Sequence, residues 1–226
     1  MTGETKAPPE RMADFFDARS ESYEEHMERS VSAFRHFYEA VAEPIAETDE
    51  TVKILDIGCG TGLELAAIFE RAPNALITAI DISQGMLAEL RKRYRARLDQ
   101  LSVTIGSYLE VPFDEEAYDY AVAVMTLHHL LPAGKLELYR RIRRALRPGG
   151  AYIEGDWVVS PEEERHYLSR YATRRKQIDP DDEGGYHIDV PLSLERERSL
   201  LIEAGFSGVD VVWRAEGNAV WIARTH

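Results

Sequence analysis

Apolar residues recur along the chain in two alternating spacings from residue 52 onward. Short apolar runs of strand length occupy residues 52–57, 75–81, 102–106, 118–126 and 150–156. Segments with apolar residues three and four positions apart, which is the spacing of an amphipathic helix, follow most of these runs. Alternating strands and helices of this length favour a parallel sheet covered by helices on both faces. We therefore expect a doubly wound α/β fold.

The two ends of the chain depart from this alternation. Residues 9–47 have helical apolar spacing and precede the first strand, so we expect a helical lid there. After a helix at 192–204, two short apolar runs at 209–214 and 219–223 are joined by only four residues. Such a short link predicts an antiparallel hairpin at the C-terminus. The charged segment 157–191 interrupts the alternation and is expected to be an insertion on the substrate side.

Composition narrows the class of protein. A chain of 226 residues with 44% hydrophobic residues fits one globular domain over residues 1–226. The longest apolar run, residues 120–127, is far shorter than the ~20 residues of a membrane-spanning helix. One cysteine, Cys59, excludes an internal disulfide and a cysteine metal cluster, so we expect no metal site and a reducing, cytoplasmic location.

The charge balance bears on the partner. A net charge of −13 works against nucleic-acid binding, which draws its affinity from Lys and Arg on phosphates. We therefore expect a small-molecule partner and no membrane partner. Monomer and homodimer both stay open.

The sharpest chemical signal is a glycine-rich turn after the first strand. The strand ends in Asp56 and continues directly into Gly58-Cys59-Gly60-Thr61-Gly62 before the next helix. Glycines at such a turn let the backbone approach a ligand, and the following helix presents free amide groups. Asp81, at the end of the second strand, is placed to accept hydrogen bonds from ribose hydroxyls. A nucleotide-like ligand is indicated.

Two ligands compete for this turn, a nicotinamide dinucleotide and S-adenosylmethionine. The dinucleotide pattern G-x-G-x-x-G requires glycine at position 63, where this chain has Leu63. The carboxylate of Asp56 would also repel a pyrophosphate, whereas it would attract a cationic sulfonium ligand with an ammonium group. The charge argument favours S-adenosylmethionine.

At this point the chain resembles the class I S-adenosylmethionine-dependent methyltransferases, in their small-molecule branch. The resemblance rests on motifs in the family's order between residues 50 and 156: Val52-Lys53-Ile54-Leu55-Asp56-Ile57-Gly58-Cys59-Gly60-Thr61-Gly62, Asp81-Ile82-Ser83-Gln84-Gly85-Met86-Leu87, Tyr118-Asp119-Tyr120-Ala121-Val122, Leu127-His128-His129-Leu130 and Leu146-Arg147-Pro148-Gly149-Gly150. It implies a Rossmann-like, seven-stranded sheet, mostly parallel, that ends in an antiparallel hairpin. That agrees with the strands counted above.

The resemblance also implies roles for individual residues. Asp56 and the glycines would surround the methionine part of the cofactor, Asp81 would hold the ribose, and Ile82 and Met86 would flank the adenine. Many relatives carry an acid after the third strand that holds the amino group of the adenine. This chain has Ser107 and Tyr108 there. We expect Ser107 to hydrogen-bond to the adenine and Tyr108 to stack on its ring. The expected cofactor-binding set is Asp56, Gly58, Cys59, Gly60, Gly62, Asp81, Ile82, Met86, Ser107, Tyr108, Met125 and Tyr23.

Tyr23 belongs to that set because the segment 15–23 resembles the lid helix of the family's small-molecule branch. An aromatic residue in such a lid often covers the cofactor. A core-facing aromatic on an amphipathic helix is the alternative for Tyr23, and it stays open.

Candidate catalytic residues follow the fourth strand. His128 and His129 fall at the carboxyl edge of the sheet, where ligands bind in this architecture. One is expected to face the methyl acceptor as a proton acceptor, the other to be a packed histidine. The candidate substrate contacts are Glu154, Asp156, Trp157 and His187. For Glu154 and Asp156 the alternative is a structural role, in which the carboxylate caps a helix or pairs with a residue of a helix.

The sequence thus predicts an enzyme that transfers a methyl group from S-adenosylmethionine to a small-molecule acceptor by in-line displacement. A carboxy-S-adenosylmethionine synthase and a non-catalytic S-adenosylmethionine-binding protein remain as alternatives. The acceptor and its reacting atom are not readable from the sequence.

Overall fold

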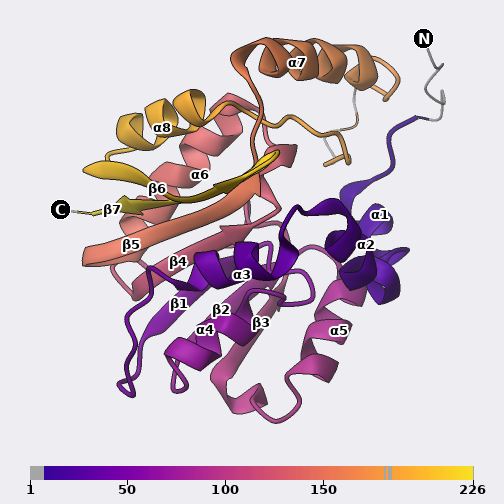
Figure 1. Ribbon diagram of the computed structural model, residues 1–226. Coiled ribbons are helices and arrows are strands. Elements are labelled where there is room, and N and C mark those ends of the chain that lie inside the picture. Colours follow the sequence, from indigo (N-terminus) through magenta and orange to yellow (C-terminus); the bar gives the residue numbers. More distant parts are fainter. Residues whose placement is uncertain (1–7, 181, 183–184, 226) are drawn as a thin grey trace.

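The computed structural model describes residues 8–180, 182 and 185–225. Residues 1–7, 181, 183–184 and 226 lie outside the described residues, although the expected domain and insertion include them. Over the described residues the chain forms one seven-stranded sheet in the order β3-β2-β1-β4-β5-β7-β6 (Figure 1). The strands are β1 (Lys53–Ile57), β2 (Leu76–Asp81), β3 (Leu101–Ile105), β4 (Tyr118–Val124), β5 (Leu146–Trp157), β6 (Gly208–Ala215) and β7 (Asn218–Arg224).

Strands β1 to β5 pair in parallel, and β7 is antiparallel to both β5 and β6. The expected doubly wound sheet with a C-terminal antiparallel hairpin is confirmed. None of the described helices is long and apolar enough to cross a membrane.

Helices cover both faces of the sheet because its strands carry apolar side chains on both sides. Alternate residues of β1 show this, since Ile54 packs in one core cluster and Leu55 in the other. The first cluster lies under α3 (Phe34–Ala42), α4 (Leu65–Arg71) and α5 (Gln84–Arg93). The second lies under α6 (Pro132–Ala145) and α8 (Leu194–Glu203). Short 3₁₀ turns occur at η2 (Leu98–Gln100) and η3 (Leu127–His129).

The N-terminal segment is divided where one helical stretch was expected. It forms α1 (Met12–Asp17), η1 (Ser20–Ser22) and α2 (Tyr23–Ser30) before α3. Ala33 separates α2 from α3 with a left-handed φ of 52°. Helix α3 belongs to the core, because Phe37 is fully buried there and packs against β5 at Gly155. Only α1 to α2, which lie beside α5, have the position of a lid (Figure 1).

Two other elements differ from the expected bounds. Strand β5 begins at Leu146, four residues before the expected start, because Leu146 pairs with Tyr118 and the pairing resumes only at Ala151. The intervening residues therefore bulge out of the strand. The charged segment contains α7 (Pro161–Arg175), which a capping box at Ser160 starts and which lies outside the helix layers (Figure 1).

Candidate active site

The site lies where the strand order reverses. Strand β1 is flanked by β2 on one side and β4 on the other, so the chain leaves the centre of the sheet in opposite directions. In open α/β sheets such a switch point forms a crevice at the carboxyl ends of the strands. Two cavities occur at this edge, of about 40 and 810 Å³. Both are lined by Phe16, Tyr23, Met125 and His129.

The glycine loop after β1 is held by the end of β2. The backbone amides of Gly58 and Cys59 donate to the carbonyl of Ile80, at 2.8 and 3.1 Å. The amide of Gly60 donates to Asp81 Oδ2 at 2.9 Å. Gly58 has a φ of +67°, and a Cβ there would lie 2.2 Å from Thr126 Oγ1. Only glycine fits this position, which brings the loop against the end of β4.

Asp56 is buried beneath this loop beside a second carboxyl group, that of Glu64. It is 1% exposed, and no amide, hydroxyl or basic side chain of the described residues donates a hydrogen bond to either of its oxygens. Glu64, which also has an unpartnered buried oxygen, lies close enough to interact with it. Burial raises the pKa of Asp56 well above its usual range and that of Glu64 to about 7. A cationic ligand would relieve both carboxyl groups, which fits the ammonium group of S-adenosylmethionine.

The small cavity collects most of the residues expected around the cofactor. Its lining includes Tyr23, Gly58, Gly60, Asp81, Ile82, Met86, Tyr108 and Met125. Other residues of the expected set lie beside it rather than in its wall. Cys59 is buried with Sγ 3.9 Å from the Gly60 carbonyl, and Ser107 accepts a hydrogen bond from the Leu109 amide. Gly62 bonds through its carbonyl to the hydroxyl of Tyr94.

The N-terminal segment closes the small cavity. Met12, Phe16 and Tyr23 form part of its wall, and a volume of about 40 Å³ is far below the ~300 Å³ of the smallest typical ligand pockets. Asp17 fastens the segment to α5, since its Oδ1 accepts hydrogen bonds from Ser83 Oγ at 2.6 Å and from the Gly85 amide at 2.8 Å. A ligand of nucleoside size therefore fits this cavity only if the segment moves.

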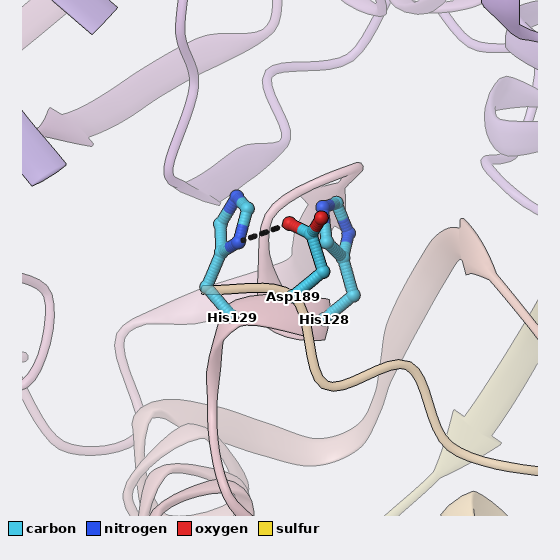
Figure 2. Close-up of side chains that lie close together, drawn as sticks. All are labelled: His128, His129 and Asp189. Atoms are coloured by element: carbon cyan, nitrogen blue, oxygen red, sulfur yellow. Dashed lines mark ion pairs between the residues drawn. The ribbon is translucent and has the colours of Figure 1, made fainter. Parts of the chain in front are cut away.

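The large cavity has both aromatic and polar walls, and its polar residues include Arg19, Arg29 and Glu216 as well as a cluster that we call the polar end. Phe15, Phe16 and Trp157 contribute aromatic surface. The polar end is formed by His128, His129, His187 and Asp189. Asp189 comes from the segment between α7 and α8, about sixty residues along the chain from the two adjacent histidines (Figure 2).

Asp156 orients His128 and is not part of the cavity wall. Its Oδ1 lies 2.6 Å from His128 Nδ1, and its Oδ2 accepts the His128 amide at 3.0 Å. The Trp157 amide also donates to Oδ1, at 2.7 Å. Burial opposes the charge on both side chains, but their pairing outweighs it, so the pKa of His128 is raised and that of Asp156 lowered. The placement of Asp156 as a direct substrate contact is therefore corrected.

His129 is in a different electrostatic position from its neighbour. Burial and the adjacent His128 lower the pKa of His129 to about 4. Its Nδ1 lies 3.3 Å from Asp189 Oδ1, as the dashed line in Figure 2 marks, yet it forms no hydrogen bond. At neutral pH His129 is thus an uncharged imidazole with an unpartnered ring nitrogen.

Glu154 also differs from its expected place. Its side chain lies on the α6 side of the sheet, where the hydroxyls of Tyr139 and Tyr152 each donate to Oε2 at 2.8 Å. Lys135 Nζ is 3.9 Å from its other oxygen. Side chains alternate between the two faces of β5, and this alternation points Glu154 into the layer between the sheet and α6. Glu154 belongs to a buried network and does not contact the cavity, whereas Trp157 and His187 line it.

Glu64 and Asp189 are two acidic residues of the site that sequence reasoning missed, and Met12, Phe16 and Thr126 of the cavity walls were not predicted either. Glu64 follows the glycine loop without belonging to a motif. Asp189 had a weak signal, because its spacing of two from His187 puts both side chains on one side of an extended segment.

Comparisons with known proteins agree with this geometry. A family described as a methyltransferase domain matches residues 54–150. The carboxy-S-adenosyl-L-methionine synthase of Campylobacter fetus is 22% identical over 96% of this chain and 97% of its own length. The 24-methylenesterol C-methyltransferase 2 of Arabidopsis thaliana is 31% identical over 72% of this chain, which spans only 40% of that protein.

Solved structures share the fold. Phosphoethanolamine N-methyltransferase 2 of Haemonchus contortus, in complex with phosphomonomethylethanolamine and S-adenosylhomocysteine, superposes with a TM-score of 0.62 at 16% identity. The match covers 84% of this chain and 53% of that one. These solved structures show the fold, whereas the matched methyltransferase domain and the 31% identical relative, taken with the glycine loop, show that the chain belongs to the class I S-adenosylmethionine-dependent methyltransferases, the family whose cofactor is S-adenosylmethionine.

Proposed function

We propose that this methyltransferase modifies a small-molecule acceptor that binds in the large cavity. The observation that carries the proposal is the wall of Phe16, Tyr23, Met125 and His129 that the two cavities share. An acceptor in one would lie directly beside a cofactor in the other. A volume of about 810 Å³ is in the range of small-molecule pockets.

The cofactor site is part of this proposal. Asp56 would take the ammonium group, the loop glycines would border the methionine chain, and Asp81 would hold the ribose hydroxyls. Ile82, Met86 and Tyr108 would enclose the adenine. When bound, S-adenosylmethionine supplies an electrophilic methyl group on a sulfonium, and the protein contributes mainly the alignment of the acceptor with it.

The two adjacent histidines have different roles in the proposal. Asp156 holds His128 through Nδ1, which leaves Nε2 for the acceptor, and the raised pKa makes His128 a stronger base than an isolated imidazole. His129, with a pKa of about 4, is a weak base. We therefore propose that His128 takes the acceptor's proton and that His129 and Trp157 contact the acceptor.

The proposal also covers the class of acceptor, the cellular compartment and the bounds of the domain. The net charge of −13 disfavours a nucleic-acid acceptor. The buried single thiol of Cys59 suits a reducing compartment such as the cytoplasm. The domain would comprise residues 1–226, with α1 to α2 as its lid and 157–191 as its insertion.

A carboxy-S-adenosylmethionine synthase is the second candidate. It is supported by the relative that carries this name and aligns over 96% of this chain. The two candidates differ in their products. Methyl transfer consumes the cofactor's methyl group, whereas the second candidate keeps that group and replaces one of its hydrogens with a carboxyl group from a carboxylic-acid donor included in the assay, which takes up the hydrogen.

Calorimetric titration with S-adenosylmethionine, S-adenosylhomocysteine and NADH, followed by mass spectrometry of products from an acceptor panel, tests both readings. We expect the first two ligands to bind and NADH not to bind. Gly60→Val, which adds a side chain at a φ of +50°, and Asp81→Ala should abolish binding. S-adenosylhomocysteine plus a methylated acceptor supports the proposal. A cofactor heavier by one carboxyl group selects the second candidate, and binding of NADH alone contradicts both.

A further inference from the structure

The polar end of the large cavity gathers potential metal ligands. His128 and His129 are each 8% exposed, and Asp189 is half-buried beside them. One ligand atom from each residue lies within 4.8 Å of the others, with the side chains facing one another (Figure 2). The earlier expectation of no metal rested on the cysteine count, which carries no information on histidine and carboxylate ligands.

His129 and Asp189 lie at a distance that also suits two ligands of one ion. His129 Nδ1 is buried without a hydrogen-bond partner, although Asp189 Oδ1 is only 3.3 Å away. A buried polar atom without a partner requires an explanation. Two ligand atoms each about 2.1 Å from a tetrahedral ion are about 3.4 Å apart. A cation between the two would satisfy both atoms with almost no movement.

His128 has the surroundings of a metal-binding histidine. Its Nδ1 is paired with Asp156 Oδ1, which leaves Nε2 as the free ring nitrogen. A carboxylate behind a histidine is the usual arrangement that fixes the orientation of a metal ligand. The ligand atoms of the cluster all lie within 4.8 Å of one another, so any pair wider than about 3.4 Å must draw closer to reach tetrahedral spacing.

We propose that His128, His129 and Asp189 bind one divalent transition-metal ion, of the Zn²⁺ or Fe²⁺ class, at the polar end of the large cavity. Two imidazole nitrogens and one carboxylate favour such ions over Mg²⁺ and Ca²⁺, which prefer oxygen ligands. His187, whose Nε2 is 3.7 Å from Asp189 Oδ1, is the nearest further imidazole. The remaining coordination positions face the cavity.

The consequence for catalysis rests on the proposed function, whereas ion binding itself does not. An acceptor oxygen or nitrogen that coordinates the ion would have a lowered pKa and a fixed position beside the cofactor cavity. With the ion bound, His128 is a ligand, and the ion replaces it in activating the acceptor.

The test uses the full chain, untagged and stripped with a chelator, titrated with Co²⁺ and Zn²⁺ in the absence of cofactor. We expect one ion per chain by calorimetry and the visible absorption bands of Co²⁺ in a low-coordinate site, which Zn²⁺ abolishes. His129→Gln and Asp189→Asn should each weaken binding about 100-fold, and Asp156→Asn about 10-fold. His36→Gln, an exposed histidine on α3, is the matched control and should leave binding unchanged.

Two results overturn the inference: no stoichiometric binding, or equal binding by the wild type, His129→Gln and Asp189→Asn. Circular dichroism of each variant establishes that it folds. A parallel titration of the wild type with S-adenosylhomocysteine separates this failure from a failure of the proposed function, because the ion is titrated in the absence of cofactor and the cofactor is titrated into the chelator-stripped protein.

Discussion

The ends of strands β1 and β5 carry two aspartates with the same burial and opposite surroundings. Asp56 and Asp156 are each 1% exposed at the carboxyl edge of the sheet. Asp156 accepts hydrogen bonds from His128 Nδ1 and from two backbone amides, whereas no amide, hydroxyl or basic side chain of the described residues donates to Asp56. Their pKa values move in opposite directions, raised for Asp56 by burial and lowered for Asp156, despite burial, by the pairing with His128.

The difference shows that burial alone does not define the role of a carboxylate. The protein itself satisfies Asp156, so this residue stabilises the folded state and orients His128. Asp56 costs stability until a cation reaches it, and we infer that it is kept for ligand binding. Variants that remove each charge should therefore change different properties of the protein.

Asp156→Asn should have the largest effect. Removing one partner of a buried ion pair typically costs about 3 kcal/mol or more, and the amide cannot accept all of the hydrogen bonds at this position. We expect the free energy of unfolding, measured by denaturant titration, to fall by about that amount. The pKa of His128, followed by NMR, should fall as well. Asp99→Asn, at an exposed site, is the matched control, and an equal loss in both variants would contradict the account.

Asp56→Asn should weaken cofactor binding without destabilising the protein. A hydrogen bond to a charged group contributes about 1.5–3 kcal/mol, so the affinity for S-adenosylhomocysteine should fall roughly 10- to 100-fold in calorimetry. The folded state holds a proton at Asp56 that the unfolded chain releases above its ordinary pKa. Asp56 should therefore make wild-type stability fall as pH rises from about 4 toward its raised pKa, by at most about 1.4 kcal/mol per pH unit. Asp56→Asn should remove this contribution and make the slope shallower, whereas Glu64, whose pKa is also raised, keeps its own contribution.

Asp17→Ala should have the smallest effect and should act on cofactor release. The variant loses the hydrogen bonds from Ser83 and Gly85 that fasten α1 to α5. If losing these hydrogen bonds destabilises the closed segment by about 1 kcal/mol, dissociation of S-adenosylhomocysteine should be roughly 5-fold faster in stopped-flow experiments. Asp14→Ala, on the same helix, should leave the rate unchanged. A rate in Asp17→Ala equal to that of the wild type would show that the segment does not control release.

Much of the proposed cofactor site, which consists of the glycine loop and the small cavity, could be predicted from sequence, because its residues follow the ends of consecutive strands. Asp56, the loop glycines and Asp81 belong to short motifs. The local direction of the chain determines the geometry of these motifs. The strand spacing likewise predicted the parallel sheet and the hairpin, both of which are confirmed.

The large cavity, which is the proposed acceptor site, was much less predictable, because segments that are distant in the sequence form its walls. Asp189 meets His129 only through the path of the chain after α7, and no periodic pattern records that path. Glu154 was expected at the cavity because it shares one face of the fifth strand with Asp156, close to the carboxyl edge of the sheet. A buried partner network on α6 and α8 determined its actual direction, and that network depends on tertiary packing.

The most direct test of the account is thermal unfolding of the wild type, Asp56→Asn and Asp156→Asn at neutral pH, each with and without S-adenosylhomocysteine. The account predicts that Asp56→Asn unfolds at or above the wild-type temperature but loses most of the shift that the ligand produces. It predicts that Asp156→Asn unfolds at a lower temperature and keeps the full shift. A destabilised Asp56→Asn that retains the ligand shift would contradict the assignment of Asp56 to the cofactor.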